Sequence, residues 1–455
     1  WALIPAIFQA LGASIAQAIN TYSVIFFSTL LITATEIVYA ISKSKLSFLI
    51  TPLILISHGS LKMFDPLHRP SLSQVTQYRP DLTDFNDDRS FGYNGNMFNM
   101  FYFLQERQLI IACLGLLNFG TILWFKNEFR TKYFILLAVL FGLFTQWHLY
   151  VALTFVILGG SYWLIETIRT KRLAFSKLFW FVAIVTTLTG IHLIVLQTYT
   201  RLSPYFDSSI TQGYPKINFE FAQWESGSLH PILQTILYYF YAYGFRLIVY
   251  GIGLYVLFKK KRQLFFLTVS MSPIFLLINT IQLSPHTVYD NHKWLKPFNL
   301  FLDTFTLAGF LIFWKQFPSK VKQLWLWIII VLAMTSGLVS AYSYLSQKPN
   351  VPFGNLESDR VKAILQTPPQ SVFITLHTND IFLAGRRTFV ASYLGQSLGI
   401  RTNERFALQD KLFELQEIKE KCDFIRGNNL LQLGDYLYED MNKPLIDINL
   451  LCRET

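Results

Sequence analysis

Apolar runs, many of them near 20 residues long, alternate with short polar segments along most of the chain. They cover Trp1–Ile19, Tyr22–Ile41, Leu46–Ile56, Leu109–Phe125, Tyr133–Ile168, Leu178–Leu196, Ile232–Phe258, Leu264–Leu283, Leu300–Trp314 and Leu324–Leu345. A transmembrane helix needs about 20 mostly apolar residues. The run from Tyr133 to Ile168 is too long for one span and fits a hairpin of two. The pattern therefore predicts an all-α polytopic membrane domain over residues 1–345, with about eleven spans. Because the chain opens inside an apolar run, we also expect upstream segments.

The pattern changes after residue 345. Elements that read as short helices, Leu356–Leu365 and Asp410–Glu420, alternate with stretches rich in β-forming residues, Ser371–Leu376 and Thr388–Tyr393, and a further short element follows at Leu430–Tyr438. Such alternation is typical of α/β domains. About 110 residues suffice for independent folding. Residues 346–455 are therefore predicted to form a small α/β domain.

Basic residues concentrate in every second turn between the apolar runs. The turns at 42–45, 126–132, 169–177, 259–262 and 315–322 together hold sixteen Lys and Arg and one acid, Glu128. Cytoplasmic loops of membrane proteins carry such an excess. The long mixed-charge loops and residues 346–455 then fall on the extracytoplasmic side of a cell membrane.

Composition and charge agree with this interpretation. The chain is 52% hydrophobic and 15% charged, whereas soluble domains average about 25% charged residues. The net charge of +11 follows from the basic turns, so we predict no nucleic-acid partner. Of the three cysteines, Cys113 lies in an apolar run, while Cys422 and Cys452 could pair if their domain faces an oxidising compartment.

The first long loop gathers carboxylates. Asp81, Asp84, Asp87 and Asp88 lie within eight residues, and oxygen ligands suit Mg²⁺ or Mn²⁺. Asp84, Asp87 and Asp88 are therefore candidate metal ligands. The alternative is a solvated loop whose Asp and Asn residues form turns.

A few polar residues interrupt or border the apolar runs. Arg246, Glu36 and Asp303 lie inside them, where a charge needs a partner, so each belongs either to a buried pair or to a cavity lining. His148 at the hairpin tip and the polar stretch Ser284–Phe298 border them, and we expect the latter at a membrane surface or polar cavity.

Four short stretches carry a resemblance to a known class. QER at 105–107, GLFTQWH at 142–148, YDNHKW at 289–294 and the segment around LAGRRTFVASYLG at 383–395 resemble P-Q-R, G-L-L-P-x-x-H, W-D-N-x-K and L-x-G-R-x-x-x-x-G-Y-x-G of a group of bacterial and archaeal multi-spanning proteins. That group looks like the GT-C class of glycosyltransferases. Such enzymes take a sugar from a polyprenyl phosphate or pyrophosphate on the outer face of the membrane.

The resemblance implies site residues at the matching positions. The recurrent polar positions of the group fall at Arg107, His148, Asp290, Asn291, Lys293 and Arg386, but the match does not imply their individual roles. We take Asp290, Lys293 and His148 as candidate catalytic residues and Arg107, Asn291, Arg386 and the run-interior Arg246 as candidates for binding substrate phosphate. This chain departs from the group at Glu106 and Tyr289, and it lacks the W-W-D-x-G motif of oligosaccharyltransferases. Enzymes of the class place a catalytic Asp or Glu in the first outer loop, after the first span. If two spans and that loop lie upstream of Trp1, the catalytic carboxylate is absent from this sequence.

Three function classes remain open on the sequence. The first is a GT-C-type glycosyltransferase with a polyprenyl-phosphate sugar donor, membrane lipid as partner and Mg²⁺ or Mn²⁺ as a possible cofactor. The second is a transporter or flippase of a polar lipid, with Arg246, Glu36 and Asp303 lining its pathway. The third is a non-catalytic assembly subunit.

Overall fold

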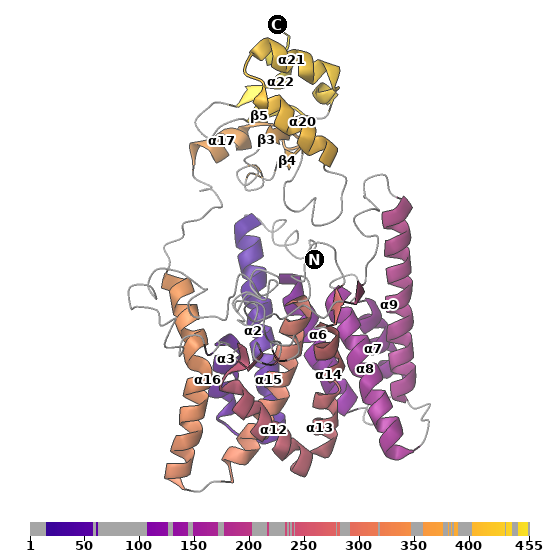
Figure 1. Ribbon diagram of the computed structural model, residues 1–455, viewed down its shortest axis with the longest axis vertical. Helices are drawn as coiled ribbons and strands as arrows, with labels where there is room; N and C mark the ends of the chain where they lie inside the picture. Colours follow the sequence, from indigo (N-terminus) through magenta and orange to yellow (C-terminus); the bar gives the residue numbers. More distant parts are fainter. Residues whose placement is uncertain are drawn as a thin grey trace. The chain divides into compact units, whose positions relative to one another are not determined.

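The computed structural model divides the chain into two compact units (Figure 1). The boundary between the helical unit and the C-terminal unit falls between Gln347 and Lys348. The structure describes residues 15–57, 107–125, 131–143, 149–171, 177–202, 242–278, 280–282, 292–316, 319–346, 358–375, 386–389, 403–432, 434–438 and 445–453, and also residues 61, 216–217, 233, 236, 239–240, 381 and 384.

The helical unit is built from helices that run side by side (Figure 1). They are α2 (Ile15–Ser42), α3 (Ser47–Ile56), α6 (Arg107–Trp124), α7 (Thr131–Leu143), α8 (Leu149–Thr170), α9 (Lys177–Leu202), α12 (Arg246–Lys260), α13 (Arg262–Val269), α14 (Ser272–Ile278), α15 (His292–Trp314) and α16 (Lys320–Ser346). Strands β1 (Lys216–Ile217) and β2 (Ile281–Gln282) form a short antiparallel pair.

The predicted helical character is confirmed, but the predicted number of spans is not supported. Within the described residues, two helical segments are long and apolar enough to cross a membrane, Thr21–Ser42 and Leu295–Trp314. Shorter apolar helices of 10–17 residues make up much of the rest. The long run from Tyr133 does form two helices, α7 and α8, as its length predicts.

Two predicted boundaries at the ends of apolar runs are wrong. The turn expected between Ile19 and Tyr22 lies inside the continuous helix α2. Asn20 and Thr21 are polar, but neither breaks a helix as Gly or Pro does. Helix α15 begins at His292, eight residues before the apolar run Leu300–Trp314, so the predicted start of that span is wrong.

Two runs predicted as single spans are broken. Gly244 interrupts Ile232–Phe258 with a φ of +52°, a left-handed conformation that ends a helix, and α12 starts two residues later. Leu264–Leu283 divides into α13 and α14 because Pro273 has no N–H for the carbonyl of Val269. The hydroxyl of Ser272 donates to that carbonyl instead, at 2.7 Å.

Helices α12 and α15 pack closely and run parallel. Later residues of α12 contact later residues of α15. Tyr243, just before α12, bonds to Asn299 in the first half of α15, and Gly253 further along α12 meets the backbone of Thr306. Both helices therefore end on the same side of the unit. Those ends carry the basic turns 259–262 and 315–322.

Contacts between other helices bring the helix ends that flank the remaining basic turns to this side. Lys315 Nζ donates to the carbonyl of Lys43, and the guanidinium of Arg169 lies 5.6 Å from the ring of Phe266. Phe134 at the start of α7 contacts Phe181 at the start of α9, with 4.8 Å between ring centroids. We call the helix ends beside turns 42–45, 126–132, 169–177, 259–262 and 315–322 the basic end.

The C-terminal unit combines helices with a small mixed sheet, as its pattern predicts. Its elements are α17 (Asp359–Gln366), β3 (Val372–Thr375), β4 (Arg387–Thr388), α20 (Asn403–Glu414), α21 (Ile418–Gly427), a 3₁₀ turn (Leu430–Gln432), β5 (Tyr436–Tyr438), β6 (Ile446–Asp447) and α22 (Ile448–Leu451). The strand order is β4-β3-β5-β6, with β3 parallel to both neighbours and β6 antiparallel to β5. The prediction of one helix over Asp410–Glu420 is wrong, because α20 ends at Glu414 and α21 begins at Ile418.

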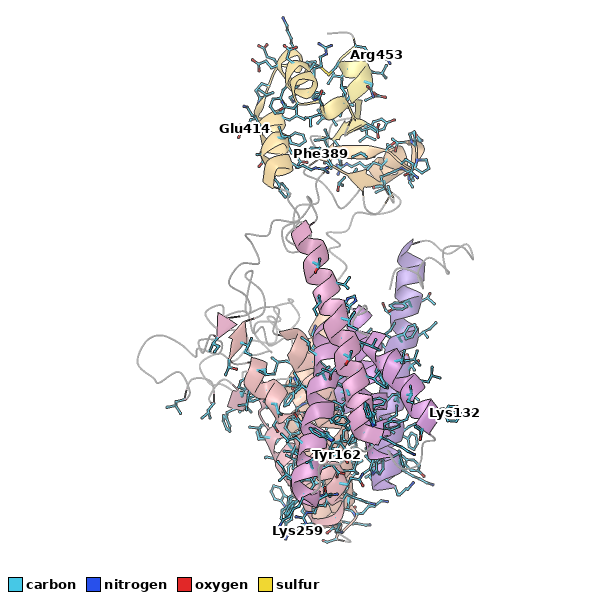
Figure 2. All side chains as sticks on the ribbon, turned by 90° about the vertical axis from the view of Figure 1, so that its right-hand side faces the viewer. Lys132, Tyr162, Lys259, Phe389, Glu414 and Arg453 are labelled. Carbon is cyan, nitrogen blue, oxygen red and sulfur yellow. A yellow bond between two sulfur atoms is a disulfide. The ribbon has the colours of Figure 1, made fainter. Side chains whose placement is uncertain are left out.

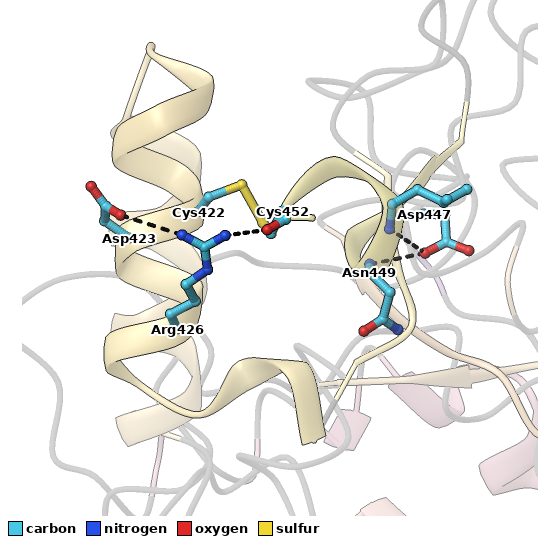
Figure 3. The surroundings of a disulfide bond; sticks show 7 residues. Cys422, Asp423, Arg426, Asp447, Asn449 and Cys452 are labelled. Carbon is cyan, nitrogen blue, oxygen red and sulfur yellow. Dashed lines mark hydrogen bonds and ion pairs between the residues drawn. A yellow bond between two sulfur atoms is a disulfide. The ribbon is translucent and has the colours of Figure 1, made fainter. Parts of the chain in front are cut away.

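A disulfide joins the last two helices of this unit (Figure 3). Cys422 on α21 bonds to Cys452 just after α22, closing a loop of 30 residues, while Cys113 in α6 is buried and forms no disulfide with a described cysteine. Arg426 on α21 also donates to the carbonyl of Cys452. The pairing that the sequence left open is thus present in the structure.

Removing this cross-link is expected to destabilise the C-terminal unit. Cys452→Ser should lower its free energy of unfolding by about 2–4 kcal/mol, because the unfolded chain regains the freedom that the closed loop removes. Hydrogen exchange of residues 403–453 in the full chain measures the effect. Cys422→Ser and the double variant should match Cys452→Ser, since all three break one bond. Additive losses would contradict this account.

Candidate functional site

The predicted site residues divide into three groups. Six lie outside the described residues: Asp84, Asp87, Asp88, His148, Asp290 and Asn291. For Arg107 and Lys293 the structure gives the backbone, which places them on the first turns of α6 and α15. Arg246 and Arg386 are described in full.

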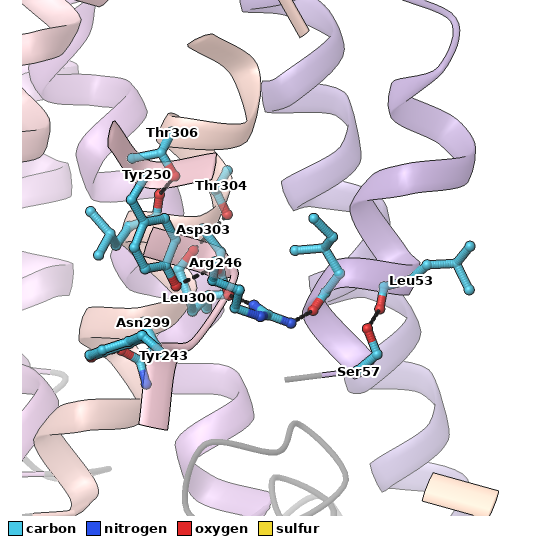
Figure 4. A network of polar contacts seen from close by, with 12 residues as sticks. Leu53, Ser57, Tyr243, Arg246, Tyr250, Asn299, Leu300, Asp303, Thr304 and Thr306 are labelled. Atoms are coloured by element: carbon cyan, nitrogen blue, oxygen red, sulfur yellow. Dashed lines mark hydrogen bonds and ion pairs between the residues drawn. The ribbon is translucent and has the colours of Figure 1, made fainter. Parts of the chain in front are cut away.

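Arg246 has the polar partner that its place in an apolar run predicts (Figure 4). Its Nη1 donates to Asp303 Oδ2 at 2.8 Å, and its Nη2 donates to the backbone carbonyl of Ile54 on α3. The Tyr250 hydroxyl donates to the second oxygen of Asp303 at 2.7 Å. Arg246 and Asp303 are 1% and 4% exposed, so the pair is isolated from solvent. One buried ion pair therefore joins α3, α12 and α15.

The network extends toward the start of α15 but is not fully satisfied. The Tyr243 hydroxyl donates to Asn299 Oδ1 at 2.6 Å. Two buried nitrogen atoms, Arg246 Nε and Asn299 Nδ2, have no hydrogen-bond partner among the described residues. Glu36, the third charge predicted inside a span, is exposed on α2. Arg246 and Asp303 thus fit the buried-pair alternative.

The starts of α6 and α15 lie at the end opposite the basic end. The Gln263 side chain donates to the carbonyl of Trp124 at 3.2 Å, which holds the last residue of α6 beside the start of α13. Since α6 and α15 both end at the basic end, Arg107 and Lys293 lie at the other one. A helix N-terminus carries a partial positive charge, which adds to these cations and favours an anion. Arg246 lies beside Asp303, about 15 Å deeper along α15 than Lys293.

Arg386 is engaged by its own unit. Its guanidinium donates to the carbonyls of Leu365, Thr367 and Ala384 at 2.6–3.0 Å and, through Nε, to the Thr367 hydroxyl at 3.2 Å. The bonds to Leu365 and Thr367 satisfy carbonyls at the C-terminus of α17, which lack partners within the helix. The contacts give Arg386 a structural role, and phosphate binding by this residue stays a prediction.

No group of three or more His, Cys, Asp and Glu side chains that could hold a metal ion occurs in the described part of the chain. The carboxylates predicted as metal ligands lie outside it. Sequence reasoning missed Tyr243, Tyr250 and Asn299, which complete the buried network. The sequence gives little reason to single out these three residues, because tyrosine is frequent throughout this chain and hydroxyl groups are common in apolar helices.

Comparisons with known protein families and with curated proteins identify no relative of this chain. No model of a known protein family matches the chain, and a search of curated proteins finds no significant match.

Proposed function

We propose that this chain is a membrane glycosyltransferase of the GT-C type, which transfers a sugar from a polyprenyl-phosphate donor on the extracytoplasmic face. One observation carries the proposal. The cations at the positions of the family resemblance, Arg107 and Lys293, begin helices at the end opposite the basic turns. A phosphate-binding site on the outer face needs cations at that end.

The outer surfaces of the helices support membrane embedding. Large apolar side chains are exposed on α2, α7, α9 and α16: Val24, Ile32, Leu136, Leu140, Ile191, Ile194, Leu324 and Trp325. Exposed apolar surface of this extent fits contact with lipid. We therefore propose that the helices from α2 to α16 cross the bilayer alternately, with α13 and α14 as one broken pass.

Two independent observations support the orientation. The gathered basic turns fit the cytoplasmic side. Helix α16 starts at the basic end and, with 27 residues, is about 40 Å long, so it ends on the opposite side and leads into the C-terminal unit. That unit contains the disulfide between Cys422 and Cys452, and disulfides persist in oxidising compartments outside the cytosol.

The proposed chemistry follows from charge. When the sugar leaves its donor, negative charge grows on the lipid phosphate, and preorganised cations and helix N-termini stabilise that charge. Arg107 and Lys293 supply this function in the proposal, and Asp290 and His148 are the candidates for holding or moving the acceptor proton. Asp84, Asp87 and Asp88 would bind Mg²⁺ or Mn²⁺ where a metal assists.

A transfer assay tests the proposal. The full chain, reconstituted in liposomes together with solubilised cell-envelope components as the source of acceptor, is supplied with polyprenyl phosphate bearing radiolabelled mannose, glucose or galactose, each in a separate reaction. We expect one donor to be consumed, and Arg107→Ala and Lys293→Ala each to lower the rate about 100-fold, the effect of removing one group that stabilises transition-state charge.

The matched controls remove the same charge at the other end. Lys260→Ala and Lys320→Ala should leave the rate within about twofold, because these exposed side chains lie at the basic end. Equal losses in all four variants would indicate an effect of net charge and would contradict the proposed site. Failure to consume any of the three donors would count against the proposal.

A further inference from the structure

The basic end is a strongly cationic surface. Its exposed side chains are Lys43, Lys45, Lys132, Arg169, Lys171, Lys177, Lys259, Lys260, Lys261, Arg262, Lys315 and Lys320. Among the described residues of this end the acidic side chain is Glu166, which is ion-paired with Arg169 at 2.9 Å. Among the described residues this surface therefore carries a large excess of positive charge, which attracts anions.

Aromatic rings lie directly beneath several of these cations. The ammonium of Lys132 lies 5.1 Å from the ring centroid of Tyr133, and that of Lys259 lies 5.9 Å from Tyr255. Aromatic rings are enriched at the level of lipid headgroups, and Lys and Arg extend their charges from apolar surface toward the polar interface. The arrangement fits the depth of a headgroup layer.

Three helices meet at one place on this surface. The guanidinium groups of Arg169 on α8 and Arg262 on α13 lie 5.6 and 5.7 Å from the same ring, that of Phe266. The Gln263 side chain bonds the carbonyl of Trp124 at 3.2 Å and the hydroxyl of Tyr162 at 3.3 Å, which fixes α6 and α8 beside α13. Figure 2 shows Tyr162 and Lys259 toward this end of the unit.

The two arginines are suited to a phosphate group. A guanidinium presents a planar set of donors that matches phosphate. Arg169 already directs its Nη2 atom at Glu166, so a phosphate would bind its other nitrogens. Arg262 contacts the rings of Phe258 and Phe266 and makes no ion pair with a described carboxylate. Both side chains are exposed, so a headgroup can approach them without rearrangement of the helices.

We infer that this junction, formed by Arg169, Arg262 and Phe266, binds the phosphate headgroup of an anionic phospholipid in the leaflet at the basic end. Basic sites between helices on the cytoplasmic side of membrane proteins bind such headgroups. The inference rests on the membrane embedding in the proposed function and is independent of sugar transfer.

Native mass spectrometry of the full chain tests the inference. The protein in detergent micelles is mixed with phosphatidylglycerol or phosphatidylcholine, and retained lipids are counted at increasing lipid concentration. We expect preferential retention of phosphatidylglycerol. Arg169→Gln/Arg262→Gln should weaken its binding about 30-fold, the effect of two basic groups at a membrane surface. Phosphatidylcholine binding should not change.

Three controls separate the possible outcomes. Lys362→Gln/Lys419→Gln removes the same charge from exposed sites in the C-terminal unit and should leave phosphatidylglycerol binding unchanged. Inorganic phosphate in solution should not displace the lipid; displacement would indicate a site for free phosphate and would overturn the assignment. Equal binding of both lipids, or equal loss in the two double variants, would also overturn it.

A separate measurement distinguishes the absence of the lipid site from failure of the proposed function. Extraction of cell membranes with alkaline carbonate releases a peripheral protein and leaves an embedded one. Release of the full chain would refute membrane embedding itself. Retention in the membrane without preference for phosphatidylglycerol would refute the lipid site alone.

Discussion

Replacing Asp303 with asparagine is expected to lower the free energy of unfolding of the helical unit by about 3–5 kcal/mol. The change keeps the shape of the side chain but removes the charge that compensates Arg246, which is 1% exposed and bonded to Asp303 at 2.8 Å. Losing one partner of a buried ion pair leaves the other charge in an apolar environment. Equilibrium unfolding of the full chain in mixed micelles, followed by intrinsic fluorescence, measures the loss.

A second variant distinguishes charge compensation from a general intolerance of the site. Arg246→Met/Tyr250→Phe/Asp303→Leu removes both charges and the hydroxyl that bonds them, and it keeps similar side-chain volumes. Replacing a buried ion pair with packed apolar side chains is often neutral or stabilising. The triple variant should therefore recover most of the stability that Asp303→Asn loses. A triple variant as unstable as the single one would contradict the role assigned to this pair.

Periodicity and elementary electrostatics predicted part of this molecule. The polar partner required by Arg246 is present, and the long run from Tyr133 divides into α7 and α8. Both features follow from local properties of the sequence. A charge in apolar surroundings is costly and needs a partner, and an apolar run of 36 residues is too long for one span. Which acid forms the pair was not predictable, because Glu36 and Asp303 occupied equivalent places in the pattern.

The missed features depend on backbone conformation and on contacts between distant segments. The breaks at Gly244 and near Pro273 could have been predicted, since Gly and Pro interrupt helices. They were missed because the runs were defined by apolar composition alone. The gap between α20 and α21 contains neither residue. The parallel packing of α12 and α15 depends on tertiary contacts that no periodicity encodes. For Arg107 and Lys293, the sequence predicted a common side, and the directions of α6 and α15 support it.

Replacing Gly253 with leucine is expected to separate α12 from α15 and to destabilise the helical unit on the order of 4 kcal/mol, a loss seen for few single substitutions. A Cβ atom at Gly253 would lie 2.1 Å from the carbonyl oxygen of Thr306, and one at Gly309 would lie 2.3 Å from the carbonyl oxygen of Gly253. Both obstacles are backbone atoms, which cannot move without displacing a whole helix. Small residues permit such close helix packing.

Gly251 provides a matched control on the same helix. A Cβ atom there meets nothing within 4 Å, so Gly251→Ala should be neutral or slightly stabilising, because alanine favours the helix. Unfolding in mixed micelles compares it with Gly253→Ala. Equal changes in the free energy of unfolding for Gly251→Ala and Gly253→Ala would mean that helix propensity, and not the close approach of the two backbones, determines the effect of Gly253→Ala.

The effect of Gly253 should also depend on the ion pair. Separating α12 from α15 lengthens the bond between Arg246 and Asp303, so a protein that already carries Gly253→Leu has less of this interaction left to lose. Neighbouring substitutions that disrupt one interface are not additive. The loss caused by Asp303→Asn should therefore be smaller in the Gly253→Leu background than in the wild type. Full additivity would mean that the ion pair survives the separation and that α3, through the carbonyl of Ile54, holds Arg246 in place.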